Sequence, residues 1–245
     1  MPLTLATVAP GEAASEAQAQ PEIFASLQGE GPSAGRPCAF VRLSNCNLAC
    51  RWCDTAYTWR FAGPEAYDRK AEQVVLSDAE VADRIRALGQ DRLVVTGGEP
   101  LLQAPALARM LALLPGMRVE IETNGTVAPS PALDALVHQY NVSPKLAHSG
   151  NPAEGALVPD RLAAFAADPR AFFKFVVAAP GDLREVTELQ ARYAIPGERL
   201  FLMPEGTDSA ALRERSRWLA DWVMTHRVRL SDRLHIHLYG DTRGT

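Results

Sequence analysis

The sequence predicts an α/β fold built as a partial, open parallel β/α barrel of about six strands. Short apolar segments of strand length alternate with longer segments of helical periodicity, which is the pattern of right-handed βαβ units. Roughly six or seven such strands are recognisable, fewer than a closed eight-unit barrel needs. Polar motifs that contain glycine or proline follow directly after these strands. Barrels and open α/β sheets bind ligands at this edge, so the pattern also indicates where a site lies.

The length and composition fit one such domain. The chain has 245 residues, of which 47% are hydrophobic, enough for a sizeable core. A formal net charge of −4 argues against nucleic acid as a partner. No apolar run reaches the length of a membrane span and no secretory signal is recognisable, so we expect no membrane partner. Clustered thiols without an export signal predict a reducing, cytoplasmic location.

The first part of the chain differs from the rest. Residues 1–20 are rich in Ala, Glu and Gln and show little periodicity, which predicts a flexible N-terminal extension. The predicted domain covers residues 21–245. It opens with an alternating apolar segment that begins at Glu22 and runs into the glycine-rich turn at 29–32, as a strand leading into a loop would.

The later strands and helices are identified by their apolar patterns. The predicted strands are short apolar runs at 38–43, 93–95, 118–121, 140–142, 172–177, 200–203 and 234–238. The predicted helices lie at about 77–89, 105–114, 132–139, 160–167, 182–193 and 208–228. Ser77 and Glu80 have the spacing of a capping box, which supports the first of these helices. Residues 56–75 form an aromatic, irregular segment, either a lid over the site or a plain surface insertion.

Two histidines lie near the end of the chain. His235 and His237 are two residues apart on the predicted strand 234–238, so they would share one face of it. No third imidazole or carboxylate is clustered with them in the sequence. We therefore expect them to pack or to form hydrogen bonds, and we do not expect them to bind a metal.

Three of the four cysteines, Cys46, Cys50 and Cys53, fall within one loop with the spacing C-x3-C-x2-C. Three thiolates on one loop can hold three corners of a [4Fe–4S] cluster, which leaves the fourth iron open to a small chelating molecule. Structural zinc would need a fourth ligand, and only Cys38 is available, inside a predicted strand. A disulfide framework is typical of short secreted chains, and this chain is neither short nor visibly secreted.

Four further motifs at strand ends would share a rim with the cysteine loop, and they lie at 96–100, 122–125, 143–145 and 204–206. Gly98 lets a ligand approach the backbone, unless this is an ordinary strand-to-helix turn. Asn124 is either a turn residue or a hydrogen-bonding partner of a ligand. Lys145 either reaches into the barrel or is a solvated surface lysine. The guanidinium of Arg42 suits a planar carboxylate or a pterin edge, unless it forms a structural ion pair.

These motifs resemble those of one enzyme family. The segments SLQGEG at 26–31, FVRL at 40–43 and the cysteine loop with its WCDT ending at 52–55 are followed by TGGEP at 96–100, ETNG at 122–125 and SPK at 143–145. In sequence and order they resemble the 7-carboxy-7-deazaguanine synthases, which belong to the radical S-adenosylmethionine (SAM) enzymes. The resemblance covers about residues 22–145, and LQGEG and WCDT are its most specific parts. Asn45 is a departure, because glycine is expected before the first cysteine, and the long N-terminal extension is another.

The resemblance implies three cofactors: a [4Fe–4S] cluster with three cysteine ligands, SAM and Mg²⁺. It implies conversion of 6-carboxy-5,6,7,8-tetrahydropterin to 7-carboxy-7-deazaguanine with loss of ammonia, in queuosine and other 7-deazapurine biosynthesis. In the family a 5′-deoxyadenosyl radical derived from SAM starts a ring contraction, after which SAM is regenerated. A flavodoxin- or ferredoxin-type electron donor and a homodimer are further expectations from the resemblance.

The resemblance also implies roles for individual residues. Cys46, Cys50 and Cys53 would hold the cluster, and Thr55 would bind Mg²⁺ through its hydroxyl. The residues expected to contact SAM are Trp52, Cys53, Asp54, Gly98, Glu99, Asn124, Ser143, Pro144 and Lys145. The residues expected to contact the substrate are Leu27, Gln28, Gly29, Arg42, Thr96 and Thr245. No side chain is assigned as a catalytic acid or base.

Two alternatives stay open on the sequence. A glycyl-radical-activating enzyme shares the C-x3-C-x2-C loop but acts on a protein backbone, and the LQGEG and WCDT segments disfavour it. A zinc- or cluster-stabilised binding module would not be an enzyme, and it would be inert toward SAM.

Overall fold

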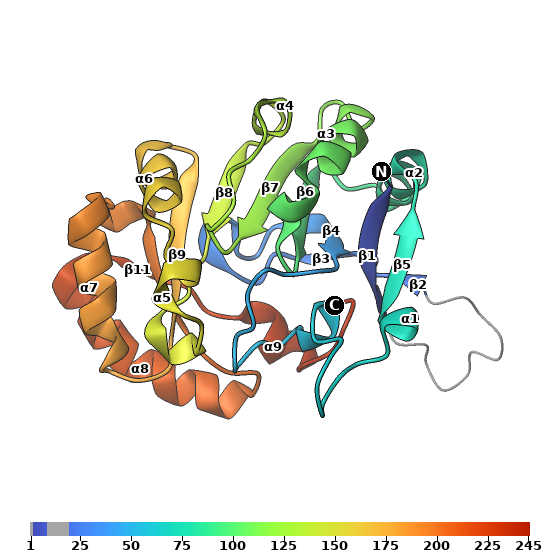
Figure 1. The fold of residues 1–245 in the computed structure, drawn as a ribbon. Helices are drawn as coiled ribbons and strands as arrows, with labels where there is room; N and C mark the ends of the chain where they lie inside the picture. The colour runs from blue at the N-terminus through green and yellow to red at the C-terminus, as the bar shows by residue number, and fades with distance from the viewer. Residues whose placement is uncertain (1, 9–19) are drawn as a thin grey trace.

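An open, mostly parallel sheet forms the centre of the molecule (Figure 1). The computed structural model describes residues 2–8 and 20–245. The strand order is β11-β10-β9-β8-β7-β6-β4-β1-β2, and every pair from β11 to β4 is parallel. The parallel strands are β4 (Pro37–Leu43), β6 (Arg92–Gly97), β7 (Arg118–Thr123), β8 (Gln139–Val142), β9 (Ala171–Val177), β10 (Leu200–Pro204) and the short β11 (Arg229–Leu230). Among the described strands, β11 at one edge of the sheet does not pair with β2 at the other, so the sheet stays open, which confirms the predicted partial barrel.

Antiparallel strands extend the sheet beyond β4. β1 (Leu3–Val8) pairs with β4, with β2 (Gln20–Pro21) and with β5 (Gln73–Leu76), and β3 (Ile23–Leu27) pairs with the other part of β4. The prediction of a flexible extension is therefore wrong for Leu3–Val8. Leu3 and Leu5 are fully buried, because a strand that pairs with two neighbours places alternate side chains in the core. Residues 1 and 9–19 of the predicted extension lie outside the described residues.

The helices that connect the parallel strands lie around the outside of the sheet (Figure 1). They are α2 (Asp78–Ala87), α3 (Ala104–Ala112), α4 (Pro131–Asp134), α6 (Pro159–Ala167), α7 (Asp182–Tyr193) and α8 (Ser209–His226). The short α5 (Ala153–Ala156) instead packs against the cysteine loop, where Ala156 clusters with Leu48 and Cys50. The capping box of Ser77 and Glu80 is present at the start of α2, as the sequence predicts. Within the described residues, none of the helices is both long and apolar enough to span a membrane.

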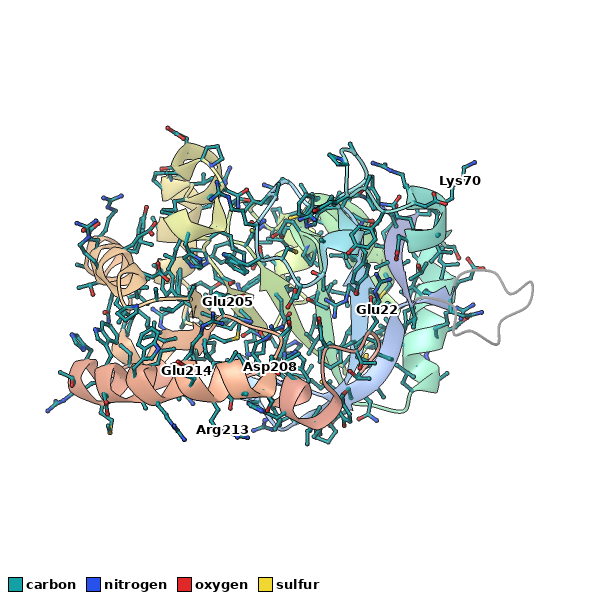
Figure 2. The ribbon with its side chains drawn as sticks, turned by 90° about the horizontal axis from the view of Figure 1, so that it is seen from below. Glu22, Lys70, Glu205, Asp208, Arg213 and Glu214 are labelled. Atoms are coloured by element: carbon teal, nitrogen blue, oxygen red, sulfur yellow. The ribbon has the colours of Figure 1, made fainter. Side chains whose placement is uncertain are left out.

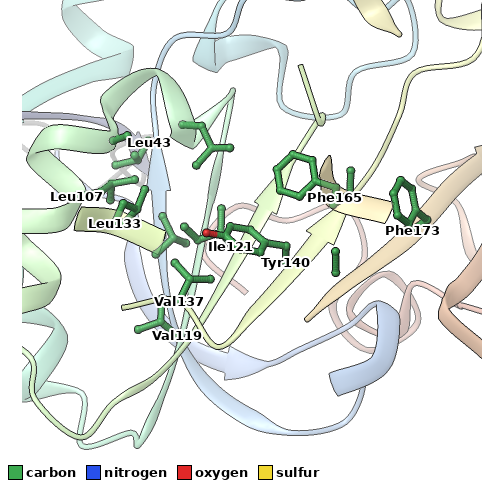
Figure 3. Packing of buried hydrophobic residues seen from close by; sticks show 14 of the residues in the cluster. Leu43, Leu107, Val119, Ile121, Leu133, Val137, Tyr140, Phe165 and Phe173 are labelled. Atoms are coloured by element: carbon green, nitrogen blue, oxygen red, sulfur yellow. The ribbon is translucent and has the colours of Figure 1, made fainter. Parts of the chain in front are cut away.

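The main core lies between the sheet and these helices. Leu107 of α3 and Leu133 of α4 belong to the same buried cluster as Ile121 of β7 and Tyr140 of β8 (Figure 3). Alternate residues of the strands point the other way, into the barrel interior, where Val94 of β6 joins a separate small cluster. Because the helices cover the outer face of the strands, the inner face and the strand ends are left for a site.

The structure corrects two of the predicted elements. Residues 234–238 form a helix, α9 (Leu234–Tyr239), and not a strand, so His235 and His237 do not share a strand face. The apolar alternation there is misleading, because Ile236 is buried while Leu238 is half exposed. The predicted helix 132–139 is only the short α4, since β8 already begins at Gln139. Segment 56–75 is less irregular than predicted, because it contains α1 (Arg69–Glu72) and the start of β5.

Candidate active site

The loops that follow the parallel strands surround one cavity of about 240 Å³. β4, β6, β7 and β8 each deliver one of the predicted motifs to it, because the carboxyl ends of parallel strands meet at one edge of a sheet. The predicted site residues that line this cavity are Leu27, Gln28, Gly29, Arg42, Cys46, Cys50, Trp52, Cys53, Asp54, Thr55, Thr96, Gly98, Asn124, Ser143, Lys145 and Thr245. Glu99 and Pro144 do not line it.

Three thiols face the cavity and the fourth does not. Cys46, Cys50 and Cys53 line it, whereas Cys38 is fully buried against Phe40 and Val94. The sequence has four cysteines in all, so three remain for the cavity. In the described ranges, no group of three or more His, Cys, Asp or Glu side chains is placed to hold a metal ion. A cubane cluster does not need such convergence on one point, because each thiolate binds its own iron.

The cysteine loop begins with a backbone conformation that few residues adopt. Asn45 has φ 76°, in the left-handed region where glycine is preferred and asparagine is among the best tolerated alternatives. Its backbone N–H donates to the carbonyl of Thr58 at 2.7 Å, and its side chain accepts from Gln73 at 3.1 Å. The departure from the expected glycine is thus compatible with the loop that carries Cys46.

N–H groups are directed at each of the three thiols. The Asn151 side-chain amide donates to Cys50 Sγ at 3.2 Å, and the indole of Trp59 donates to Cys53 Sγ at 3.3 Å. The backbone N–H of Leu48 donates to Cys46 Sγ at 3.4 Å. Donors of this kind stabilise thiolates, so the three sulfurs lie in surroundings that suit them as ligands of a cluster.

Burial keeps the thiols of Cys46 and Cys50 protonated when no metal is bound. It raises the pKa of Cys46 to about 11, and it also raises the pKa of Cys50. The thiolate is the ligand form, so cluster assembly must displace protons from these groups. Reconstitution of the cluster is therefore expected to release protons.

The donors to the sulfurs lead to a prediction about the electron-transfer step. A hydrogen bond to a cluster thiolate favours the reduced, more negative state, so removing one lowers the reduction potential. For Trp59→Phe, which keeps the ring and removes the N–H, we expect the potential to fall by about 40 mV, the equivalent of one hydrogen bond of roughly 1 kcal/mol. Redox titration followed by electron paramagnetic resonance measures this. An unchanged potential would show that the indole does not contact the cluster sulfur; Trp218→Phe, on the distant helix α8, is the matched control.

Trp52 and Lys145 form the wall beside the cysteine loop. The Trp52 ring stacks on His148 with centroids 5.4 Å apart, and the Lys145 ammonium lies 5.4 Å from the Trp52 ring centroid. Lys145 also donates to the Ser143 hydroxyl at 2.9 Å. The indole Nε1 of Trp52 is buried and has no hydrogen-bond partner in the described part of the chain. An unpaired buried donor beside three thiols fits a site that binds a polar cofactor.

Glycines let the backbone of the β6 loop pass close to the cysteine loop. A Cβ on Gly98 would lie 2.1 Å from the carbonyl oxygen of Asn45, so no other residue fits there without moving the loop. The carboxylate of the neighbouring Glu99 is fully buried. It accepts hydrogen bonds from Leu101 N–H, the Thr123 hydroxyl and Asn124 N–H at 2.7–3.0 Å. Glu99 therefore joins two loops of the rim and does not line the cavity, and its contact with SAM stays a prediction.

A set of polar groups from β4, β6 and β7, and from Gln28 directly after β3, also lines the cavity. The carboxylate of Glu122 accepts from the Gln28 amide at 3.1 Å and from the Thr96 hydroxyl at 2.7 Å. Arg42 donates from Nε to Glu22 at 2.8 Å, so the predicted alternative of an ion pair is realised while the side chain also lines the cavity. The neighbouring strands β4, β6 and β7 thus present a guanidinium, a hydroxyl and a carboxylate, with the Gln28 amide bonded to that carboxylate, as one polar wall.

A chain of buried charges closes the side of the cavity near α9. Glu30 pairs with Lys174 and with Arg233, and Arg233 also pairs with Asp54. Burial alone would raise the pKa of Glu30, but the two cations outweigh it and hold that pKa well below its usual range. The pKa of Asp54 is likewise lowered, because Arg233 outweighs burial. Glu30 and Asp54 are therefore ionised. Their ion pairs with Lys174 and Arg233 hold this side of the cavity in one arrangement.

Several lining residues are not among those predicted. They are Glu22, Glu30, Tyr57, Trp59, Glu122, Asn141, Lys174, Arg233, His235 and Arg243. Two of them are joined to predicted residues across large sequence separations: Glu122 to Gln28 across 94 residues, and Arg233 to Asp54 across 179. A usable signal existed for Glu122, which ends a predicted strand, and for Glu30, which lies in the LQGEG segment. Lys174 and Arg233 carry no local signal of a site.

The open parallel barrel and the three-thiol cavity at its carboxyl edge define a radical SAM enzyme. Residues 41–143 match the radical SAM superfamily. The crystal structure of QueE from Escherichia coli superposes with a TM-score of 0.63 at 28% identity, and the alignment covers 87% of this chain and 92% of that one. Fold, superfamily match and site thus agree on a [4Fe–4S] cluster and SAM as cofactors.

Relatives with known names define the family more closely. The chain is 40% identical over 226 residues to the 7-carboxy-7-deazaguanine synthase of Pyrobaculum aerophilum, covering 91% of this chain and 95% of that relative. It is 38% identical to the enzyme of the same name from Halobacterium salinarum, covering 91% of each chain. The chain belongs to the 7-carboxy-7-deazaguanine synthase family, as the motifs of the sequence predict.

Proposed function

We propose that this enzyme converts 6-carboxy-5,6,7,8-tetrahydropterin to 7-carboxy-7-deazaguanine with loss of ammonia, as a step of queuosine or other 7-deazapurine biosynthesis. One observation carries the proposal: a single cavity is lined both by the three cluster thiols and by the polar groups of Gln28, Arg42 and Glu122. A substrate with ring N–H groups and a carboxylate matches those polar groups. Family membership at 40% identity supports the same reaction.

The cofactors supply the radical chemistry, and the protein supplies position and protection. When bound, a [4Fe–4S] cluster and SAM provide an adenosyl radical on one-electron reduction. Cys46, Cys50 and Cys53 would anchor the cluster. The backbone at Gly98 and the side chains of Trp52 and Lys145 would hold SAM beside it, because they line the wall next to the thiols. Asp54, Asn124 and Ser143 complete the proposed SAM contacts.

At the polar wall of the cavity, the chain's own groups would select and orient the pterin. The Glu122 carboxylate can accept hydrogen bonds from ring N–H groups, since carboxylate oxygens accept more than the two bonds that Gln28 and Thr96 donate. The guanidinium of Arg42 would pair with the substrate carboxylate. Leu27, Gly29 and Thr245 line the same region and are the remaining proposed substrate contacts. Orientation by several fixed groups would keep the reacting carbon at the cofactor.

We assign Mg²⁺ binding to the Thr55 hydroxyl, which lies on the cavity wall 3.6 Å from Cys53 Sγ. Mg²⁺ prefers oxygen ligands and keeps several of them from water or substrate, so a single hydroxyl is sufficient as the contribution of the protein. For Thr55→Ala we expect the stimulation of turnover by Mg²⁺ to fall about tenfold while iron content stays unchanged. Turnover measured across a Mg²⁺ titration tests this. A wild-type titration curve in that variant would refute the assignment, and Thr225→Ala, at an exposed position of helix α8 outside the cavity lining, is the control.

The proposal extends to the setting in which the enzyme works. We place it in the cytoplasm, with a flavodoxin or ferredoxin as electron donor, because thiols that must stay free to bind a cluster need a reducing environment. We also propose a homodimer, as the family resemblance implies. We place Leu3–Val8 in the same domain as residues 21–245, because this strand pairs with β4 and β5.

The test of the proposed function is a turnover assay under anaerobic conditions. Reconstituted and chemically reduced protein is incubated with SAM and the carboxypterin, and the product is followed by mass spectrometry. We expect 7-carboxy-7-deazaguanine to form without net consumption of SAM. SAM cleavage without any pterin product would instead favour an activating enzyme that acts on a protein backbone, and absence of both would favour a binding module.

A further inference from the structure

The last residues of the described chain form part of the cavity wall. Gly240, Asp241, Thr242, Arg243 and Thr245 all line it, and the C-terminal end lies below the strands, close to the segment that follows the cysteine loop (Figure 1). The segment 240–245, called the tail below, has few regular hydrogen bonds of its own: Thr242 N–H donates to Gly240, and the Thr245 hydroxyl donates to Thr242. Its position must therefore be fixed by contacts with other elements.

One side chain of the tail makes most of those contacts. The guanidinium of Arg243 pairs with the carboxylate of Glu72 on α1, at 2.6 Å from Nη1 and 3.4 Å from Nη2. Its Cζ lies 3.4 Å from the centroid of the Tyr57 ring, so the cation also stacks on an aromatic face. Nη1 is 3.5 Å from the carbonyl oxygen of Thr7 on β1. A single residue thus joins the tail to three separate elements.

The partners of Arg243 are themselves held firmly. Tyr57 is buried, and its hydroxyl donates to the fully buried carboxylate of Glu22 at 2.8 Å. The same carboxylate accepts from Arg42. Glu72 ends α1, and this helix is tied to β1 by the bond from the Thr7 hydroxyl to the Ala71 carbonyl at 2.6 Å. The segment 56–75 therefore provides a rigid anchor on which the tail can be fixed.

We propose that Arg243 is a positioning residue for the substrate, which fastens the tail against the anchor formed by Tyr57 and Glu72 and so completes the substrate-binding part of the cavity. The segment 56–75 is then neither a mobile lid nor a plain surface insertion, but the support for the tail. The identity of the substrate rests on the proposed function, whereas the fastening itself does not. Loss of the fastening leaves the cluster thiols untouched, because none of the three cysteines contacts Arg243 in the described contacts.

The test compares Arg243→Met, Glu72→Gln and Arg243→Lys with the wild-type enzyme. We expect Arg243→Met to raise KM for the carboxypterin about tenfold, with kcat changed less than about twofold and affinity for SAM unchanged. Glu72→Gln should give a smaller rise in KM of the same kind. Arg243→Lys keeps the charge but loses the planar fork, so it should restore part of the lost affinity. Glu65→Gln is the matched control, because its ion pair with Arg60 is in the same segment but exposed.

A second readout does not depend on turnover. Hydrogen exchange of the tail amides in the substrate-free protein should be faster in Arg243→Met and Glu72→Gln than in the wild type and in Glu65→Gln. The proposal needs both results, so wild-type exchange or wild-type KM in Arg243→Met would overturn it. If the wild-type enzyme left the carboxypterin unchanged, the proposed function would fail, and the exchange comparison would still decide whether Arg243 fastens the tail.

Discussion

Replacing Cys46, Cys50 or Cys53 by serine is expected to remove the [4Fe–4S] cluster and with it all detectable turnover, whereas Cys38→Ser should retain both. The reason is geometric: three thiols line the cavity, whereas Cys38 does not line it and is buried in a small apolar cluster with Phe40 and Val94. A hydroxyl is a poor ligand for iron in a cluster that needs soft thiolates. The predicted contrast is therefore between three cysteines with one function and a fourth that only packs.

The measurements are iron and sulfide content, visible absorbance and turnover after anaerobic reconstitution. The wild type and Cys38→Ser should contain about four irons per chain. Each of the other three variants should contain much less, with cooperative thermal unfolding retained as evidence of a folded chain. Zinc in the loop of the anaerobically purified protein would contradict the assignment. So would loss of the cluster in Cys38→Ser while one of the other cysteines proved dispensable.

The parts of the site that could be predicted are those fixed by topology. In a parallel sheet the residue after each strand lies at one known edge, so recognising the strands before Cys46, Gly98, Asn124 and Ser143 was enough to bring them together. Short spacing within one loop likewise placed the three thiols. These inferences need only local apolar patterns and the handedness of βαβ units.

The parts that could not be predicted depend on pairing between distant segments. Arg233 meets Glu30 across 203 residues, and nothing near Arg233 in the sequence distinguishes it from a solvated arginine. The apolar pattern of α9 wrongly predicts a strand, because six residues are too few to distinguish the two-residue repeat of a strand from the 3.6-residue repeat of a helix. β1 was missed for a related reason: its stability comes from pairing with β4 and β5, which follow much later in the chain.

The carboxylate of Glu22 illustrates how such pairing supports a site. Figure 2 shows Glu22 in the interior of the molecule, whereas Lys70 is at the edge. The Glu22 side chain is fully buried, and each of its oxygens has one partner: Arg42 Nε at 2.8 Å and the Tyr57 hydroxyl at 2.8 Å. Burial would lower the pKa of Arg42, but Glu22 outweighs it and the pKa is raised. Removing this one carboxylate leaves a cation and a hydroxyl unpaired in the interior.

We therefore expect Glu22→Ala to reduce the free energy of unfolding by about 3 kcal/mol, the lower end of the range for breaking a buried pair, because Arg42 is partly exposed. For a chain of this length the melting temperature should fall by about 6–12 °C. The exposed pair of Asp83 and Arg86 gives the control, since Asp83→Asn should change stability by less than about 0.5 kcal/mol.

A second substitution at the same position, Glu22→Gln, separates the two roles of Arg42, which are pairing with Glu22 and binding the substrate. If Arg42 binds the substrate carboxylate and Glu22 holds the guanidinium in place, Glu22→Gln should raise KM for the carboxypterin while losing less stability than Glu22→Ala, because an amide still fills the space and accepts one hydrogen bond. Arg42→Met should then raise KM further, and the double variant should be no worse than Arg42→Met alone, since both changes act through one guanidinium. Additive effects on KM would instead mean that Glu22 supports the cavity independently of Arg42. A KM unchanged in Arg42→Met would leave Arg42 as a structural ion pair only.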